Sequence, residues 1–373
     1  MNLSRRDFLQ LIAATACPDP FIGGRRIGTV PFVDTDRVMP LDRLTGSGLD
    51  ARLSTDLSNL TADTLVMPAS KYFVRTSAPE LPDDARDRWT IRVNGLVKEP
   101  SSVSIKDLER IARSAGPFVT ECAGNSSRAG FGLISAATWS GARVGDVLKN
   151  AHPLDRATRV RISGVDRHAQ PSTTSIAGAS WVFTLDQIES SGAMLATRMN
   201  GEPLPRDHGR PVRLLVPGWY GCTCIKWVDE ITLVDDSEPA TSQMKEFAGR
   251  THQNGVPELA KDYAPASMDL AAFPIRVEKW VADSKIVYRV VGIMWGGAPT
   301  TRLQIQFNPL DAFQPFDVCP APSSTLTWTL WTYVWRPASR GRYEIALKPE
   351  DPSTPARRLE SHYYARQVWI AEV

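Results

Sequence analysis

The stretch Met199–Gly221, "MNGEPLPRDHGRPVRLLVPGWYG", joins a run of basic residues to a predicted strand. Its segment "PVRLLVPG" is a short apolar run bounded by proline and glycine, which is typical of a strand. The basic residues in and around this stretch are Arg75 in "KYFVRT", Arg206, His208, Arg213, and Lys226 in "CIKWV". Each of these basic residues, taken alone, is more typical of a solvent-exposed or structural charge. Because guanidinium groups bind phosphate and oxyanions bidentately, together they predict a site around one anionic group.

The flanking sequence alternates irregularly between strands and short helices. "WTIRVNGLV" alternates and then turns at Asn94-Gly95, as strands of hairpins do. "SIKDLERIAR" predicts a helix with Ser104 as its N-cap, and "RVGDVLKNA" predicts another. "RVRISGVD" and "IKWVDEITLVD" predict further strands. Because no regular strand–helix–strand repeat appears, the pattern favours an α+β class over a doubly wound sheet.

The C-terminal part of the chain has a different pattern. After Phe273, short alternating runs such as "TRLQIQFNP" and "GRYEIALKPED" are bounded by Gly and Pro, and no helical period appears. This pattern predicts an immunoglobulin-like β-sandwich with a boundary near residue 270. Residues from about 25 to 65 show little periodicity and predict an irregular arm. A length of 373 residues fits two domains.

A lone cysteine, Cys122, lies in the loop "FVTECAGNSSRAGF" between an apolar run and small polar residues. We interpret it as a metal ligand, because thiolates bind soft metals, with a buried inert cysteine as the alternative. The other four cysteines are Cys17, Cys222, Cys224 and Cys319, whose spacing does not suggest a disulfide framework. Cys222 and Cys224 would share one face of a strand, and we interpret them as small core residues.

The first residues, "MNLSRRDFLQLIAATAC", carry the twin arginine Arg5-Arg6 before a short apolar stretch. This motif predicts export by the bacterial twin-arginine route to the periplasm, with Ala14-Thr15-Ala16 as a cleavage site and Cys17 as a candidate for lipidation. The alternative is a basic amphipathic first helix. No apolar run reaches the roughly 18 residues of a membrane span. The net charge of +2 with scattered Lys and Arg gives no electrostatic footprint for nucleic acid.

The motifs, taken in order, resemble the sulfite oxidase family of molybdopterin-dependent oxidoreductases. "ECAGNSS", "ISAATWSGARVGDVL", the quoted "MNGEPLPRDHGRPVRLLVPGWYG" and "IKWVDEITL" are similar to its molybdopterin domain. "VVGIMWGG" and "TLTWTLWTYVWRP" are similar to its C-terminal dimerisation domain. The resemblance implies an α+β sulfite-oxidase-type molybdopterin domain followed by an immunoglobulin-like β-sandwich. The implied segments are a twin-arginine signal and tail at 1–30, a molybdopterin domain at 31–268 and a dimerisation domain at 269–373.

The resemblance also implies a molybdenum-molybdopterin cofactor and assigns roles to residues. Cys122 would be the protein ligand of the metal, and the catalytic residues would also include Tyr263, Arg75 and Arg128. The residues implied to bind the cofactor are Phe73, Arg75, Cys122, Asn125, His208, Arg213 and Lys226. The chain contains no C-x-x-C-H motif, so we expect no haem within it.

The chain departs from the family's Cys loop, in which two arginines follow C-A-G-N. Ser126 and Ser127 occupy those positions, and Arg128 is the next arginine. A pocket that loses an arginine binds a dianion more weakly. The family also brings one arginine from the sandwich domain to its pocket, for which the candidates are Arg357, Arg358 and Arg366.

The resemblance implies oxidation of sulfite to sulfate by oxygen-atom transfer, with electrons passed to a separate c-type cytochrome. It also implies a homodimer joined through the sandwich domain. The alternatives are a reductase of sulfoxides or nitrate on the same cofactor, a sulfane-sulfur dehydrogenase subunit, and a cofactor-free binding protein that kept the fold.

Overall fold

The computed structural model divides the chain into two compact units. It describes residues 24–33, 41, 43–81, 85–126, 131–166, 168, 171–172, 175–298 and 300–373. One unit is Asp36–Met268, and the other combines Met1–Thr35 with Asp269–Val373. The predictions for the twin-arginine segment, Cys17, Ser127 and Arg128 lie outside the described residues. Among the described residues, no helix has the length and apolarity to cross a membrane.

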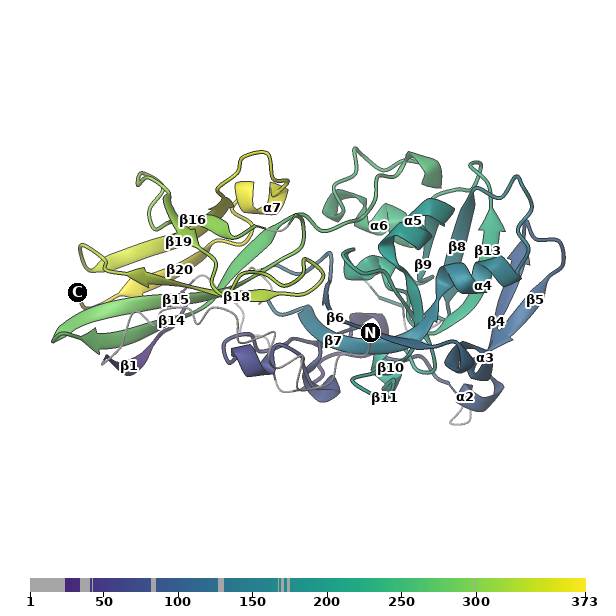
Figure 1. Cartoon of the computed structure of the whole chain (residues 1–373), viewed down its shortest axis with the longest axis horizontal. Helices are drawn as coiled ribbons and strands as arrows, with labels where there is room; N and C mark the ends of the chain where they lie inside the picture. Colours follow the sequence, from purple (N-terminus) through teal and green to yellow (C-terminus); the bar gives the residue numbers. More distant parts are fainter. Residues whose placement is uncertain are drawn as a thin grey trace. The chain divides into compact units, whose positions relative to one another are not determined.

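The unit Asp36–Met268 contains an antiparallel five-stranded sheet in the order β11-β10-β7-β6, with β12 also paired to β10 (Figure 1). Its strands are β6 (Arg113–Glu121), β7 (Ile134–Arg143), β10 (Met194–Met199), β11 (Glu202–Pro203) and β12 (Arg213–Leu215). Gly141 allows β7 and β10 to approach closely, since an added Cβ would lie 2.6 Å from the Ala196 Cα. The segment "PVRLLVPG" thus contains a strand, as predicted, and Arg213 begins it.

A second five-stranded sheet of this unit is mixed. Its spatial order is β5-β4-β13-β8-β9, and β13 pairs in parallel with β4 but antiparallel with β8. Its strands are β4 (Thr90–Gly95), β5 (Ser101–Ser104), β8 (Arg159–Gly164), β9 (Ser180–Thr184) and β13 (Val228–Val234). Alternate residues of the sheet, such as Ile91, Ile162 and Ile231, are fully buried, which is the pattern of a sheet with one covered face.

Short helices accompany these sheets. They are α2 (Ala85–Arg88), α3 (Ile105–Arg110), α4 (Val144–Asn150), α5 (Leu185–Ser191) and α6 (Ser242–Phe247). Ser104 caps α3 as predicted: its hydroxyl accepts a hydrogen bond from the Asp107 backbone N–H at 3.1 Å, and the Asp107 carboxylate accepts one from the Ser104 N–H. Thr184 and Gln187 form the same reciprocal cap on α5. The N-termini of α3 and α5 are therefore closed by local hydrogen bonds.

The other unit contains two four-stranded antiparallel sheets, in the orders β1-β14-β15-β18 and β17-β16-β19-β20 (Figure 1). The bounds are β1 (Arg25–Val30), β14 (Ala271–Ala282), β15 (Lys285–Trp295), β16 (Arg302–Gln306), β17 (Gln314–Asp317), β18 (Thr329–Trp335), β19 (Gly341–Pro349) and β20 (Arg366–Ile370), with the helix α7 (Arg357–Glu360). The largely β composition agrees with the sequence pattern after Phe273. The immunoglobulin-like assignment stays a prediction.

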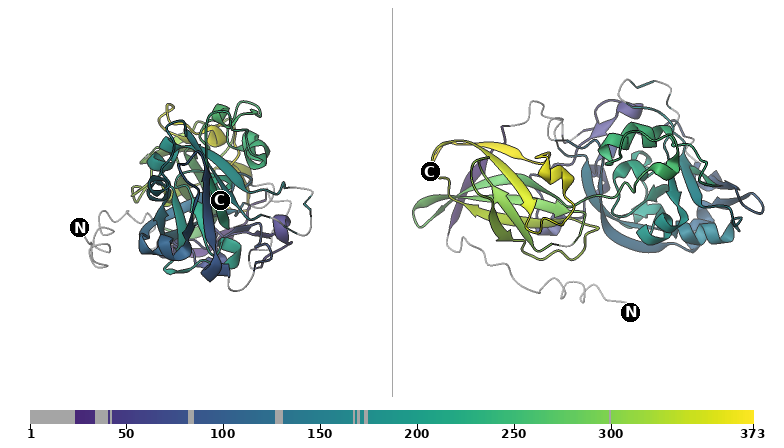
Figure 2. Two further views of the ribbon diagram at one scale, coloured as in Figure 1. Left: turned by 90° about the vertical axis from the view of Figure 1, so that its right-hand side faces the viewer. Right: turned by 90° about the horizontal axis from the view of Figure 1, so that it is seen from above.

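Two sequence predictions in this unit were wrong. Residues 25–30 were expected in an irregular arm, yet they form β1, which pairs antiparallel with β14 (Figures 1 and 2). Strand β1 is largely exposed. Its sequence therefore lacks the alternation of apolar and polar residues that predicts a half-buried strand. Cys319, placed outside any disulfide framework, is disulfide-bonded. Cysteine spacing along the chain does not reveal which thiols the fold brings together.

Candidate functional site

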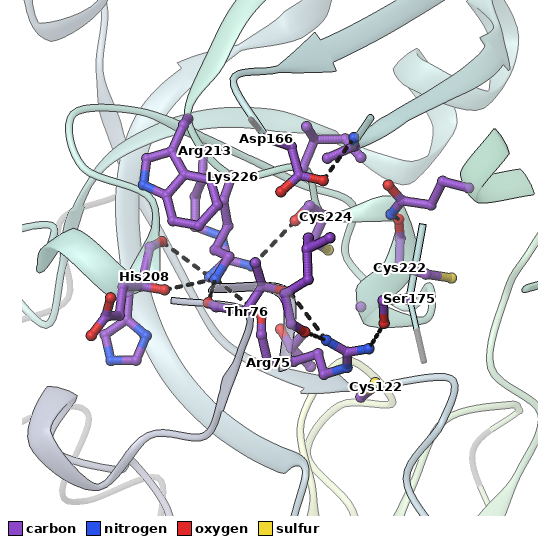
Figure 3. A pocket seen from close by; sticks show the side chains of 18 of the residues that line it. Arg75, Thr76, Cys122, Asp166, Ser175, His208, Arg213, Cys222, Cys224 and Lys226 are labelled. Atoms are coloured by element: carbon purple, nitrogen blue, oxygen red, sulfur yellow. Dashed lines mark hydrogen bonds between the residues drawn. The ribbon is translucent and has the colours of Figure 1, made fainter. Parts of the chain in front are cut away.

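A cavity of about 110 Å³ lies within the unit Asp36–Met268. Its wall is built from chain segments that are far apart in sequence. Among the lining residues are Phe73, Arg75, Cys122, His208, Arg213 and Lys226, all of them predicted site residues. Figure 3 shows the side chains of Lys226, Arg75 and Cys122 around one space. The fold thus brings together the basic residues that the sequence predicted to surround one group.

The Cys122 thiol is positioned by a loop that follows β6. The Cys122 backbone N–H donates to the Leu133 carbonyl at 2.9 Å, and the Asn125 N–H donates to the Cys122 carbonyl at 2.9 Å. The buried Asn125 side chain accepts hydrogen bonds from the backbone N–H groups of Gly132 and Leu133 at 3.0 and 2.9 Å. Asn125 does not line the cavity, so its role is to close the loop that carries the thiol.

Arg213 carries an unsatisfied hydrogen-bond donor within this wall. Its Nη1 donates to the His208 carbonyl at 3.2 Å and its Nη2 to the Cys224 carbonyl at 3.4 Å. Its Nε is buried and has no hydrogen-bond partner among the described residues. Buried guanidinium N–H groups normally find an acceptor. The orphaned Nε therefore indicates that an acceptor group binds in this cavity.

His208 is buried in the 3-10 helix η5 (Arg206–His208), and its Nε2 donates to the Ala69 carbonyl at 2.8 Å. Burial lowers the pKa of His208 from 6.5 to about 4, although the Ala69 carbonyl opposes this shift. The ring is therefore neutral near pH 7, with Nε2 protonated and Nδ1 as an acceptor. His208 can accept a hydrogen bond from a bound group but adds no positive charge.

The Lys226 ammonium is hydrogen-bonded within the cavity wall. Its Nζ donates to three backbone carbonyls, those of Arg75 at 3.1 Å, Asp207 at 2.8 Å and Thr76 (Figure 3). An ammonium has three N–H donors, so all of them are used. Burial and then the Arg213 charge lower its pKa well below the ordinary value for lysine. Lys226 therefore ties two wall segments together through its hydrogen bonds to their carbonyls.

Arg75 and Phe73 lie on the same strand segment, at β3 (Val74–Arg75) and next to it. The Arg75 guanidinium donates to the Leu49 carbonyl, to the Ser175 hydroxyl and, at 3.2 Å, to the Thr76 hydroxyl. Phe73 is buried and donates its backbone N–H to the Ser135 hydroxyl at 2.9 Å. The cavity thus has an apolar wall beside a fixed cation.

Other predicted residues are not brought to this cavity by the described structure. Tyr263 is buried, and its hydroxyl has no partner among the described residues, but it is not among the lining residues. Arg128 lies outside the described residues. The three sandwich arginines each contact residues of their own unit: Arg357 pairs with Asp269, Arg358 lies over the Tyr363 ring, and Arg366 lies over the Phe32 ring.

The sequence reading missed several residues of the cavity wall. Cys222 and Cys224 were assigned to a strand and to the core. Both are buried, but Cys222 lies within the 3-10 helix η6 (Gly221–Thr223), Cys224 follows it, and both line the cavity. The carboxylates of Asp166 and Glu246 also line it. An isolated acidic residue has no local signal in sequence that separates a cavity wall from a solvated surface.

Residues 78–242 match the family described as "Oxidoreductase molybdopterin binding domain". The chain carries this molybdopterin-binding domain and is homologous to sulfite oxidases and nitrate reductases. Its relatives include the NADPH nitrate reductase of Beauveria bassiana, which is 30% identical over 64% of this chain and 29% of that protein. The mitochondrial sulfite oxidase of Rattus norvegicus is 29% identical over 79% of this chain and 57% of that protein. The chain thus spans only part of the length of these relatives.

A solved structure agrees with this family at the level of the fold. The molybdopterin oxidoreductase superposes on a chain of the sulfane dehydrogenase SoxCD from Paracoccus pantotrophus with a TM-score of 0.61 and 19% identity. The match covers 91% of this chain and 85% of that chain. At this identity the match supports a common fold.

The cavity residues of this molybdopterin oxidoreductase fit a molybdenum-molybdopterin cofactor. Cys122 is the predicted thiol ligand among the three cavity cysteines, and the described residues contain no group of three His, Cys, Asp or Glu side chains that would bind a metal alone. The orphaned Arg213 Nε and the His208 Nδ1 offer a donor and an acceptor to the organic part of the cofactor. One soft thiol ligand, with a hydrogen-bond donor and an acceptor in the same wall, suits a metal whose other ligands come from its own organic cofactor.

Proposed function

We propose that this chain oxidises sulfite to sulfate by oxygen-atom transfer and passes the electrons to a separate c-type cytochrome. The proposal is carried by one observation: the Cys122 thiol and the Arg75 guanidinium line the same cavity. When bound, the cofactor supplies the two-electron redox change and the oxygen-atom transfer. A cation beside the thiol places a binding group for an oxyanion where that chemistry takes place.

The chain's own residues bind, orient and shield the reactants. Arg75 is held by the Leu49 carbonyl and the Ser175 hydroxyl, so its guanidinium is fixed before an anion arrives. Preorganised donors of this kind stabilise developing charge without reorganisation. Buried Phe73 and Trp227 form apolar parts of the wall. They exclude water from part of the site, which strengthens the attraction between Arg75 and an anion.

A sulfane-sulfur dehydrogenase is a second candidate, because the fold matches SoxCD over most of both chains. A nitrate reductase is a third, because fungal nitrate reductases are among the relatives. A cofactor-free binding protein is disfavoured by the thiol and the orphaned Arg213 Nε within one cavity. All three candidates with the cofactor share the site and differ in substrate.

The test is a comparison of substrates on the molybdenum-loaded protein. Sulfite-dependent reduction of ferricyanide or cytochrome c should be measured alongside dye oxidation by nitrate and by a sulfoxide. We expect turnover with sulfite and none with the two oxidants. Turnover with nitrate or sulfoxide alone would reject sulfite oxidation, and a protein that binds no molybdenum would reject the whole proposal.

We also propose that the C-terminal unit is an immunoglobulin-like dimerisation domain and that the chain is exported by the twin-arginine route. Two four-stranded antiparallel sheets support the first proposal, and Arg5-Arg6 supports the second. Gel filtration should give the mass of two chains. Replacing both arginines by lysine should retain the protein in the cytoplasm of a bacterial host, as shown by fractionation.

A further inference from the structure

Two arginines face each other beside the Cys122 cavity. Arg52 of β2 (Arg52–Leu53) and Arg75 of β3 are directly opposite in the antiparallel pair. The Arg52 Nη1 donates to the Leu49 carbonyl at 2.9 Å and to the Ala51 carbonyl at 2.8 Å. The Arg75 Nη1 donates to the same Leu49 carbonyl. Two guanidinium groups therefore converge on one backbone oxygen.

This arrangement concentrates positive charge without a direct counter-ion. Like charges directly opposite on a strand pair are unfavourable. Among the described residues, neither guanidinium forms an ion pair with a carboxylate. Asp50 and Glu246 act on both only at longer range. Burial, and next the Arg75 charge, lower the pKa of Arg52 to about 10, so Arg52 remains charged at neutral pH.

The pair is also near the reactive thiol. Arg75 and Leu49 line the cavity together with Cys122, whereas Arg52 is not among the lining residues and is the cross-strand partner of Arg75. The Cys122 thiol is close enough to interact electrostatically with both arginines. The charge of the pair therefore acts at the position where a substrate would meet the metal ligand.

We propose that Arg52 is a positioning and charge-supplying residue of the substrate site, which makes the cavity selective for a dianionic oxyanion. Arg75 contacts the anion from the wall, while Arg52 fixes the shared Leu49 carbonyl and adds a second positive charge. This charge offsets the loss of the pocket arginine that the family carries at the position of Ser127. The inference rests on the proposed function for the identity of the substrate as an oxyanion.

The test measures anion binding apart from turnover. Sulfate is a redox-inert dianion with the shape of the product, and nitrate is a monoanion. Their dissociation constants should be measured by calorimetry on the molybdenum-loaded protein and on Arg52→Gln and Arg52→Lys. We expect Arg52→Gln to weaken sulfate binding about tenfold and nitrate binding about threefold, because a Coulomb energy scales with the charge of the ligand.

The lysine variant separates charge from structure. Arg52→Lys keeps the charge but loses the forked contact with two carbonyls, so we expect sulfate binding within about threefold of the wild-type value. The matched control is Arg161→Gln, which removes a strand-borne arginine paired with Glu238 and changes net charge equally. This control should bind sulfate as the wild type does. Circular dichroism and molybdenum content verify that each variant is folded and loaded.

The outcomes distinguish this inference from the proposed function. If Arg52→Gln binds sulfate as tightly as the wild type, or if Arg161→Gln weakens it equally, the inference is overturned whether or not sulfite is oxidised. If Arg52→Lys binds as poorly as Arg52→Gln, Arg52 acts through structure alone and the charge assignment is overturned. Arg52-dependent sulfate binding without sulfite turnover would support the inference and reject sulfite as the substrate.

Discussion

At the scale of single residues, the cavity wall holds charged and ionisable groups that are buried but rarely paired with each other. The Lys226 ammonium donates its hydrogen bonds to backbone carbonyls, and the His208 ring is neutral near pH 7. The Arg213 Nε has no hydrogen-bond acceptor among the described residues. Buried charges need hydrogen bonds or a partner, so such a wall is stable only because backbone oxygens supply them. The same feature leaves specific donors free for a ligand.

Cys122 is the proposed protein ligand of the metal. Cys122→Ser should reduce turnover roughly 100-fold or more, because the hydroxyl is a poorer ligand for a soft metal than the thiolate. Turnover and molybdenum per chain should be measured together. Cys222→Ser is the matched control, since Cys222 lines the same cavity without a predicted ligand role. Full activity of Cys122→Ser would remove the metal-ligand assignment.

His208 predicts a pH dependence of stability. Because the folded pKa of about 4 is below the unfolded value of 6.5, the unfolded state binds the proton first as the pH falls. The neutral ring contributes fully above pH 6.5, and this stability is lost as the pH falls toward 4. The free energy of unfolding, from urea titrations at pH 7.5 and 4.5, should fall by about 2.5 kcal/mol more in the wild type than in His208→Gln. Equal losses would contradict the prediction.

At the scale of elements, capping and close packing decide where strands and helices lie. The Ser104 cap was predictable because its partner Asp107 is three residues away in sequence. The Cys122 loop was also recognisable from its sequence, and Asn125 closes it as a turn-forming residue would. In contrast, Cys222 and Cys224 were placed on a strand because the local pattern does not distinguish a 3-10 turn beside a cavity from a short strand.

Gly292 is a packing requirement of strand β15. An added Cβ would lie 2.6 Å from the Phe273 carbonyl oxygen and closer still to the ring of the buried Trp331 on β18. Gly292→Ala should lower the free energy of unfolding of this unit by about 1–3 kcal/mol, because the tryptophan must shift. Thermal unfolding measures the effect. Gly28→Ala in β1 of the same sheet, where nothing lies within 4 Å of the added Cβ, should have little effect.

At the scale of the whole molecule, the two ends of the chain form one unit. Strand β1 pairs with β14, and the Val33 N–H donates to the Gln367 carbonyl at 2.8 Å. Phe32 bridges to Val368 and lies 3.9 Å from the Arg366 guanidinium. Residues near the N-terminus therefore contribute to the stability of a domain encoded more than two hundred residues later.

The contribution of the Phe32 side chain to stability can be tested by substitution with alanine. Phe32→Ala should destabilise the C-terminal unit by about 1–2 kcal/mol, through lost apolar burial and the lost cation–π contact. Differential scanning calorimetry resolves the effect if the units unfold separately. Val33→Ala is the control, since its side chain is 44% exposed. An unchanged transition in Phe32→Ala would show that this contact adds no stability.

The sequence by itself determined the features that depend on near neighbours. The Ser104 cap, the strand at Arg213 and the largely β composition of the C-terminal part were predictable because hydrogen bonds and side-chain periodicity act over a few residues. Six of the cofactor-binding residues that the family motifs predicted also line one cavity. Only the tertiary structure decided that Arg52 lies opposite Arg75 and that β1 pairs with β14. It also decided that Lys226 donates its hydrogen bonds to backbone carbonyls. Each of these depends on strand register or on contacts between segments distant in sequence, which no local pattern encodes.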